Sequence, residues 1–514
     1  MTNSEQEIEA KTKRMNEGID TDHFLYKILN PKSMCVFGAN NNLIETMGSM
    51  QLRNCIAGGG FDENIYPIHP RLDKVQGFKA YNSVLDLPVV PDLAFIILPP
   101  KAVPEVMEEC GKKGIKYLII TSGGFRESGS DGVGLSEKID AIANKYNMRF
   151  IGPNCLGVYN GWFQYPKKEN AYLNTFWIYV PHKRGNVSLI SQSGTIAAQT
   201  AWHTNRMGLK IGKSISIGNE RNIDVVDFLE YFREDPQTEV IGIYLEEIKR
   251  GEEFIKLAKE ITPKKPIVAI YAGGSEAANR SIMSHTGSIG GNEKIYEAVF
   301  KETGVIQTNS VTDFLYYLRT LSFAKNNNVF PKGRNVGIIT DSGGSGSILT
   351  KMCEKFKLNV PRFSKELQDK ISDLVPPTGS KVNPVDITFF RNYNDFFVKI
   401  PKILMKSGEI DCLFFDGIFD FQEVFEVMEK SGYPVDEKIK SSMGLFFTMI
   451  IQPVQKLVRR KSIPLFYSGP QLYTHPLYRE FLDNDVHIFD FWDQPSKCMA
   501  MLVNYSEFRS KFSK

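Results

Sequence analysis

The sequence predicts an α/β protein made of three doubly wound units, each built around a parallel sheet. From Lys32 onward, short apolar runs alternate with longer amphipathic segments, which is the pattern of βαβ units. Many of the apolar runs end in glycine or a small polar residue, as strands do where a loop leads into a helix. The length of 514 residues, at roughly 150 residues per domain, also predicts about three domains.

The first unit is predicted over residues 23–160, after a polar extension at residues 1–22. Its helices include one over residues 43–57, which follows an Asn-rich turn. A parallel sheet needs several buried strands with a crossover between each pair, and the apolar runs of this unit provide them. The strands are expected at residues 33–39, 64–70, 92–100, 117–124 and 149–157.

Two further units follow, at residues 183–325 and 333–514, joined by the polar, Pro- and Gly-containing segment 325–333. The second unit is expected to form strands at residues 186–194, 210–219, 240–248 and 266–274. The third is expected to form strands at residues 335–344, 411–419, 463–469 and 486–491, followed by a helix over 495–508.

The composition excludes several classes of protein. The net charge of +3 gives no reason to expect nucleic acid or an anionic membrane as the main partner. The cysteines number seven, an odd count without a CxxC pair, which favours reduced thiols in a cytoplasmic protein over a disulfide or zinc framework. The N-terminus lacks an apolar signal segment. No apolar run reaches the roughly 18–20 residues that a membrane span requires.

Two strand-to-helix turns have the composition of phosphate-binding turns. One contains Ser191, Ser193, Gly194 and Thr195, and the other contains Ser342, Gly343 and Gly344. Helix N-termini carry unpaired N–H groups and the positive end of the helix dipole, so they hold phosphate without a basic side chain. Each turn taken alone is explained slightly better as an ordinary tight connection between strand and helix.

A histidine and a pair of glutamates are the candidate catalytic groups. His285 lies in the segment 283–291, among small, hydroxylated and glycine residues, where a flexible loop can carry an imidazole between two positions. A neutral imidazole acts as a base or as a nucleophile toward phosphorus, although a turn-capping histidine is about equally expected. Glu246 and Glu247 end a buried strand, where a carboxylate can orient an imidazole. One of the two is expected to be solvated or to begin the next helix.

The strand ends of the first unit predict a nucleotide-binding edge. The turns that follow its strands contain small, proline and amide residues, and ligands of doubly wound sheets bind at this edge. The glycine fingerprint of dinucleotide-binding proteins is absent, which argues against a dehydrogenase. No histidine or cysteine spacing typical of a metal site is present, so no metal ligand is predicted. The residues of this edge include Gly38, Ala39, Asn40, Leu98, Pro99, Pro100, Ser122, Gly123 and Asn154.

From about Asn30 onward, the order of these segments resembles the NDP-forming acyl-CoA synthetases, which include acetate–CoA ligase (ADP-forming) and succinyl-CoA ligase. The resemblance is carried by long segments that occur in the family's order: residues 92–116, TSGGFRESG, IGPNCLGVYN, SLISQSGT, residues 216–246, SHTGSIGG and VPPTGSKVNPVDIT.

The resemblance implies a Rossmann-like CoA-binding domain followed by two flavodoxin-like ligase domains. In such enzymes an acyl-CoA and phosphate give an acyl phosphate, whose phosphoryl group passes to a histidine and then to ADP. His285 matches that histidine and Glu246 matches the carboxylate that steadies it, with Glu247 as the reserve. The two Ser/Gly turns match the phosphate-binding helix N-termini. The nine edge residues named above, together with Arg71, match the CoA site.

The sequence departs from the family's pattern at three places. The usual Pro-Gly-Lys turn is replaced by the segment Asn40–Gly48, and the usual Lys-Ala-Gly-Arg run by Tyr271–Gly274. Ala198 stands where succinyl-CoA ligases have a tyrosine, so succinate is not favoured.

No segment resembling an ATP-grasp domain is found. We therefore expect a β-type ATP-grasp partner in an α2β2 assembly, which would hold most of the contacts to ADP or ATP and Mg²⁺. The expected substrates are CoA, phosphate, a small carboxylic acid and its acyl-CoA. The alternative is a non-catalytic CoA-binding regulatory or scaffold protein of the same fold.

Overall fold

The chain folds into two compact units in the computed structural model. One comprises Met1–Asn205 and Leu209–Leu318, and the other comprises Arg206–Gly208 and Arg319–Lys514. The structure describes residues 15, 17–44, 46–61, 63–163, 170–286, 291–388, 392, 394–417, 421–436, 451–469 and 476–512. The start of the predicted N-terminal extension therefore lies outside the described residues.

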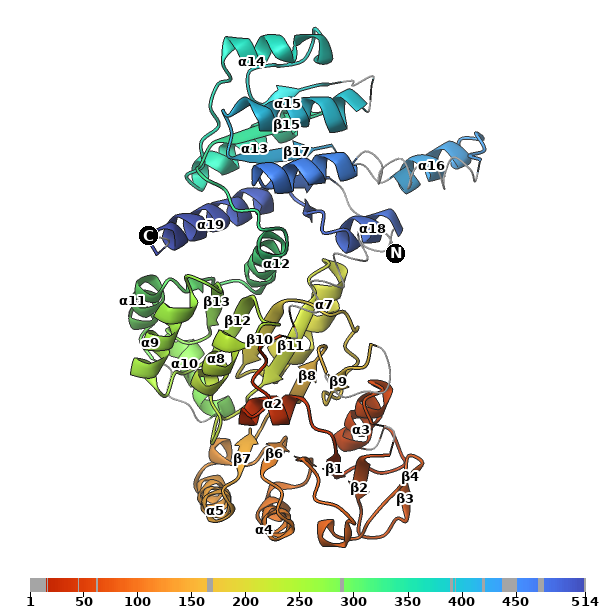
Figure 1. Cartoon of the computed structure of the whole chain (residues 1–514), viewed down its shortest axis with the longest axis vertical. Helices are drawn as coiled ribbons and strands as arrows, with labels where there is room; N and C mark the ends of the chain where they lie inside the picture. The colour runs from red at the N-terminus through yellow and green to blue at the C-terminus, as the bar shows by residue number, and fades with distance from the viewer. Residues whose placement is uncertain are drawn as a thin grey trace. The chain divides into compact units, whose positions relative to one another are not determined.

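The first sheet of the N-terminal unit has five parallel strands in the order β2-β1-β5-β6-β7 (Figure 1). Its central strands are buried on both faces, because helices cover each face of the sheet. Met34 and Val36 share a core with the helices α2 and α3, while Cys35 and Phe37 share a core with α4 and α5. The bounds are β1 Met34–Phe37, β2 Ile65–Ile68, β5 Leu93–Ile96, β6 Tyr117–Ile120, β7 Arg149–Ile151, α2 Phe24–Leu29, α3 Met47–Ala57, α4 Val103–Lys113 and α5 Ser130–Tyr146.

The second sheet has seven strands in the order β14-β13-β12-β10-β11-β8-β9. Strand β8 (Gly157–Asn160) pairs antiparallel with β11 and so belongs to this sheet, although the sequence places it at the end of the first unit. The Gly152–Pro153 peptide, which lies between β7 and β8, is cis. The other bounds are β9 Leu173–Asn174, β10 Val187–Ser191, β11 Ile211–Ser216, β12 Val240–Leu245, β13 Ile267–Tyr271 and β14 Ile306–Gln307.

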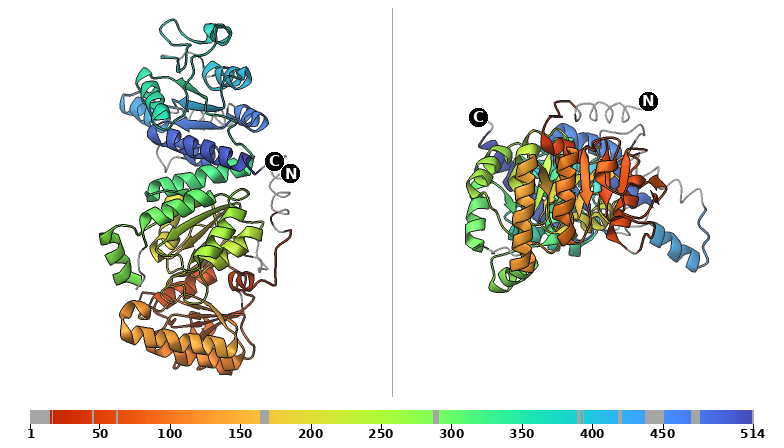
Figure 2. Two further views of the ribbon diagram at one scale, coloured as in Figure 1. Left: turned by 90° about the vertical axis from the view of Figure 1, so that its left-hand side faces the viewer. Right: turned by 90° about the horizontal axis from the view of Figure 1, so that it is seen from below.

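Helices flank the second sheet as well, and Figure 2 shows them from two further directions. Helix α8 shows why these segments are helical and buried: Asp224 caps its N-terminus in a capping box, and Phe228, Leu229 and Phe232 face the core. The bounds are α6 Gly194–Ala198, α7 Thr200–Arg206, α8 Val225–Glu234, α9 Gly251–Ile261, α10 Glu276–Thr286, α11 Glu293–Thr303 and α12 Val311–Asn327.

The C-terminal unit contains a third parallel sheet, with the strand order β16-β15-β17-β18-β19. Helices α13 and α19 pack against each other. The fold class predicted from the sequence is thus confirmed. The bounds are β15 Val336–Thr340, β16 Val385–Asp386, β17 Cys412–Asp416, β18 Leu465–Ser468, β19 Ile488–Phe489, α13 Gly343–Lys355, α14 Lys365–Lys370, α15 Ile400–Ser407, α16 Phe421–Lys430, α18 Pro476–Asp483 and α19 Asp493–Ser510. In the described part of the chain, no helix is both long and apolar enough to cross a membrane.

Candidate active site

The candidate site of the N-terminal unit is built where β10 and β12 end side by side. Gln192 follows β10, and its side-chain oxygen accepts the backbone N–H groups of Glu246 and Glu247, the latter at 3.1 Å. Its side-chain nitrogen donates to the carbonyl oxygen of Glu247 at 2.8 Å and to Glu220 Oε2 at 2.7 Å. Gln192 is 5% exposed, so this buried amide fixes the backbone that presents both glutamates.

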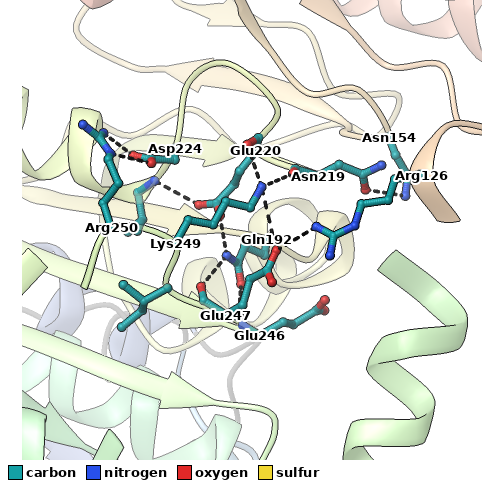
Figure 3. A network of polar contacts seen from close by, with 12 residues as sticks. Arg126, Asn154, Gln192, Asn219, Glu220, Asp224, Glu246, Glu247, Lys249 and Arg250 are labelled. Carbon is teal, nitrogen blue, oxygen red and sulfur yellow. Dashed lines mark hydrogen bonds and ion pairs between the residues drawn. The ribbon is translucent and has the colours of Figure 1, made fainter. Parts of the chain in front are cut away.

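The two glutamates at the end of β12 have different surroundings. Glu247 Oε1 lies 3.4 Å from Arg126 Nη1 and 3.8 Å from Lys249 Nζ. Glu246 is 5% exposed, and Figure 3 shows its side chain extending away from Gln192 and out of this hydrogen-bond network. Helix α9 begins only at Gly251. The expectation that one glutamate is solvated or begins the next helix is therefore wrong, because Glu247 is held by two cations and Glu246 is buried.

Glu220 is a further acidic group of this network and was not among the candidate residues predicted from the sequence. It follows β11 with a positive φ of 49° and is 3% exposed. Its two carboxyl oxygens accept from Gln192 and from the backbone N–H of Val225, at 2.7 and 2.9 Å. Burial raises the pKa of Glu220 to about 8 despite the nearby Lys249 ammonium. The sequence feature that indicates Glu220 is its position directly after the predicted strand 210–219.

The Ser/Gly turn after β10 leads directly into α6. Ser191 Oγ donates to the carbonyl oxygen of Ser193 at 2.6 Å and accepts from its N–H at 3.1 Å, so Ser191 stabilises the turn. The side chain of Ser193 makes no capping bond to α6. A Cβ on Gly194 would lie 2.5 Å from Leu156 Cγ, so close packing requires glycine there. The first N–H groups of α6, at Gly194 and Thr195, are not capped by Ser193 and are suited to an anion.

The backbone of His285 lies in the last turn of α10, not in a loop. The sequence between Glu276 and Met283 explains the difference, since alanine, glutamate, arginine and methionine are good helix formers. Helix α10 packs against the 3₁₀ helix η3 (Arg126–Ser128), which connects the first sheet to this site. The side chain of His285 and residues 287–290 lie outside the described part of the chain.

Two stacked tyrosines lie beside this segment. The rings of Tyr271 and Tyr296 are 3.7 Å apart at an angle of 9°. Tyr271 Oη donates to the carbonyl oxygen of Gly291 at 3.1 Å, and Tyr296 Oη accepts the N–H of Ile248 at the same distance. Tyr271, which stands where the resemblance leads one to expect a lysine, thus has a structural role between β12, β13 and the chain after residue 290.

The first strand-to-helix turn of the N-terminal unit is tightly packed although the dinucleotide fingerprint is absent. A Cβ on Gly48 would lie 2.5 Å from the carbonyl oxygen of Gly38, and Gly38 itself has a φ of +88°. Side-chain groups hold the start of the segment that follows Gly38: the N–H of Asn40 donates to Ser49 Oγ, and Gln76 Nε2 donates to the carbonyl oxygen of Asn40. Ala39 is buried and offers only its backbone.

Hydrogen bonds join the ends of three other strands of the first sheet. The N–H of Leu98 donates to Ser122 Oγ at 3.3 Å, and the N–H of Asn154 donates to the carbonyl oxygen of Ser122 at 2.9 Å. Asn154 Nδ2 also donates to Asn219 Oδ1 of the second sheet at 3.2 Å. A Cβ on Gly123 would lie 3.3 Å from Asn154 Oδ1, so this edge is closely packed.

The other residues expected at the CoA site are less connected. Pro99 and Pro100 precede α4, and the Pro100 ring packs against Gly124. Arg71 is exposed, and the structure gives its guanidinium no ion pair with a described residue. The structure therefore brings Leu98, Ser122, Gly123 and Asn154 together, with Arg71 at the surface.

The Ser/Gly turn of the C-terminal unit is surrounded by carboxylates. Ser342 precedes α13 without capping it, and a Cβ on Gly343 would lie 3.2 Å from Asp386 Oδ2. The pKa of Asp341 is raised to about 6 by burial and by the nearby Asp416 and Asp386 carboxylates. A Cβ on the following glycine, residue 344, would meet only a serine hydroxyl at 3.9 Å, so the helix end is uncrowded there. Among the described residues, no group of three His, Cys, Asp or Glu side chains is placed to hold a metal ion.

Comparison with known protein families matches both sheets of the N-terminal unit. Residues 32–161 match the CoA binding domain family, and residues 184–321 match the succinyl-CoA ligase like flavodoxin domain. The two matched segments contain the strand ends described above.

Similar proteins cover most of the chain. It is 36% identical over 386 residues to the α subunit of acetate–CoA ligase (ADP-forming) II from Pyrococcus furiosus, covering 75% of this chain and 80% of that subunit. This decides the family. The chain belongs to the ADP-forming acyl-CoA ligases. An acetate–CoA ligase (ADP-forming) from Methanocaldococcus jannaschii is 37% identical over 71% of this chain, which spans 49% of that longer protein.

A solved structure of the family has the same fold. The dinucleotide-forming acetyl-coenzyme A synthetase 1 of Ca. Korarchaeum cryptofilum, in complex with phosphate and ADP, superimposes with a TM-score of 0.78 and 28% sequence identity. The match covers 95% of this chain and 97% of that chain. The ADP-forming ligase fold therefore extends over both compact units.

Proposed function

We propose that this chain is the α-type subunit of an ADP-forming acyl-CoA synthetase. It interconverts acyl-CoA, ADP and phosphate with a carboxylic acid, CoA and ATP. The observation that carries the proposal is the fixed end of β12, where Gln192 presents a buried Glu246 beside the strand ends expected to bind CoA. The likeness to α subunits over 75% of the chain supports it.

Each step of the proposed cycle transfers one group. Phosphate attacks the thioester carbonyl, the C–S bond breaks, and the CoA thiolate leaves and takes up a proton. His285 then attacks the phosphorus of the acyl phosphate, the P–O bond breaks, and the carboxylate leaves. The phosphoryl group finally passes from the His285 nitrogen to the β-phosphate of ADP.

The residues of the chain have separate roles in this proposal. Glu246 orients the His285 imidazole and stabilises its positive charge, as a carboxylate does in a catalytic triad. In the N-terminal unit, the N–H groups of Gly194 and Thr195 bind phosphate at the start of α6. In the C-terminal unit, those of Gly343 and Gly344 form a second phosphate-binding helix end, at the start of α13. Asp341, Asp386 and Asp416 weaken the second turn as an anion site unless a cation accompanies the phosphate.

A partner supplies the nucleotide site in this proposal. The relatives from Pyrococcus furiosus are named as α subunits, and the chain spans only about half of the longer relative from Methanocaldococcus jannaschii. Both facts support a β-type ATP-grasp partner, in an α2β2 assembly, that holds ADP or ATP with Mg²⁺. Acetate is the first carboxylic acid to test, because several relatives are named as acetate ligases. Seven buried free thiols support a cytoplasmic location.

The test is phosphoryl labelling of the full chain purified with the ATP-grasp protein encoded in the same genome. Incubation with acetyl-CoA and ³²P-phosphate should give acid-labile, base-stable label on the wild type and on His203→Asn, a control on the exposed histidine of α7. His285→Ala should carry no label, and Glu246→Gln should carry at least tenfold less. Equal absence of label from the wild type and His285→Ala would overturn the proposal.

A further inference from the structure

Three arginine–carboxylate pairs join the first sheet and its helices to the second sheet within the N-terminal unit. Arg221 contacts Asp140 through two nitrogens, at 2.7 and 2.5 Å. Arg149 pairs with Asp227 at 3.4 Å, and its guanidinium also donates to Asn222 and lies 4.1 Å from the centre of the Phe24 ring. Both arginines are thus held by several contacts.

Arg126 is held differently. Among the described residues, its guanidinium makes one hydrogen bond, from Nη1 to Glu247 Oε1 at 3.4 Å. A guanidinium has five N–H groups, so within the described part of the chain most of its donors are left for an anion. Its side chain is 34% exposed, equal to that of Arg221, so the difference does not come from solvent access.

The backbone that carries Arg126 is firmly anchored. The neighbouring Glu127 accepts the N–H of Gly124 at 2.7 Å and Asn219 Nδ2 at 2.6 Å. This places the arginine between the strand ends expected to bind CoA and the end of β12 (Figure 3). Helix α10, whose last turn contains His285, packs against η3. Arg126 therefore lies between the end of β12 and the expected CoA-binding strand ends, on an element that packs against the helix containing His285.

Lys249, the other cation that contacts Glu247, is already engaged. Its ammonium donates to the carbonyl oxygens of Asn219 and Glu220, each at 2.7 Å, and lies 3.8 Å from Glu247. Lys249 is therefore committed to the backbone, yet it stays close enough to compensate the charge of Glu247. Arg126 can release Glu247 without leaving that carboxylate far from a positive charge.

We propose that Arg126 is a phosphate-binding residue of this site and that it pairs with Glu247 when no anion is present. This inference rests on the proposed function. When phosphate or the acyl phosphate enters, the Arg126 guanidinium gives up its one hydrogen bond to Glu247 and donates two hydrogen bonds to phosphoryl oxygens. Glu247 is then a positioning residue that competes with the substrate for Arg126.

The test compares inorganic phosphate binding by the full chain, measured by isothermal titration calorimetry, among four variants. Arg126→Gln should weaken binding at least tenfold, and Arg126→Lys should fall between it and the wild type. Glu247→Gln should tighten binding at least threefold, because it frees the guanidinium. Arg221→Gln, which breaks the pair that the equally exposed Arg221 makes with Asp140, should bind within twofold of the wild type.

A purely structural ion pair predicts the opposite pattern. Arg126→Gln and Glu247→Gln would then change phosphate binding in the same direction, or Arg126→Gln would behave like Arg221→Gln, and either result overturns the inference. Labelling of His285 separates this failure from that of the proposed function. An unlabelled wild type whose variants show the expected binding pattern refutes the proposed function alone, whereas a labelled wild type without the pattern refutes the role of Arg126 alone.

Discussion

The side-chain oxygen of Gln192 accepts the backbone N–H of Glu246, joining the turn after β10 to the end of β12. The same amide reaches Glu247 and Glu220, so it contacts three acidic residues from two strand ends. The position of the buried Glu246 therefore depends on a residue that carries no charge and undergoes no chemistry.

Replacing Gln192 by alanine tests this dependence. Gln192→Ala leaves two backbone N–H groups and a buried carboxylate without their partner, which should cost about 1–3 kcal/mol of unfolding free energy. The free energy of unfolding, measured by urea denaturation, and the labelling of His285, measured by phosphate incorporation, should both fall. Gln199→Ala, in the turn between α6 and α7, is the control and should change neither. Full labelling by Gln192→Ala would show that Glu246 is positioned without Gln192.

The sequence predicted central strands such as β5, β10 and β17, because each is a short apolar run whose residues are all buried. It did not predict the two-residue edge strands β14 and β16, which contain no such run. It also predicted that Glu246 and the Ser/Gly turns lie at strand ends, because this depends only on residues that are neighbours in the sequence. The roles of Gln192, Glu220 and Arg126 could not be predicted, because they arise from contacts between residues 28 to 121 positions apart. The helical backbone at His285 was missed because its serine, threonine and glycine neighbours indicate a loop, whereas the preceding segment favours a helix.

The close approach of Gly48 to Gly38 gives a second prediction. Gly48→Ala places a methyl group 2.5 Å from a carbonyl oxygen, so α3 must shift. Overpacking of this kind costs about 1–3 kcal/mol of unfolding free energy, and CoA affinity measured by calorimetry should fall with it. Gly134→Ala, in α5 with no atom within 4 Å of the new Cβ, should stabilise the chain slightly and leave CoA affinity unchanged. Equal CoA affinity in the two variants would contradict a role for this turn.

The Tyr271–Tyr296 stack should show energetic coupling. In a double-mutant cycle with Tyr271→Ala and Tyr296→Ala, urea unfolding should give a coupling free energy of about 0.5–1.5 kcal/mol, the range for paired aromatic rings. Additive effects of the two substitutions would mean that each ring packs independently. Tyr296→Phe keeps the ring but removes the hydroxyl that accepts the Ile248 N–H, and should cost about 1 kcal/mol of unfolding free energy.

Asp341 should make the stability of the C-terminal unit depend on pH. Its folded pKa of about 6 lies above the ordinary value of 3.8, so the folded state binds the proton more tightly than the unfolded state. The stabilisation from this proton is complete below about pH 4 and is lost as the pH rises through about 6. Asp341→Asn carries no titrating group, so its advantage in Tm over the wild type should grow between pH 4 and about pH 7 and then remain constant. Asp490, whose pKa is also raised to about 6, titrates in both proteins and cancels in the difference. A difference in Tm that does not change with pH would show that Asp341 ionises normally despite Asp416 and Asp386.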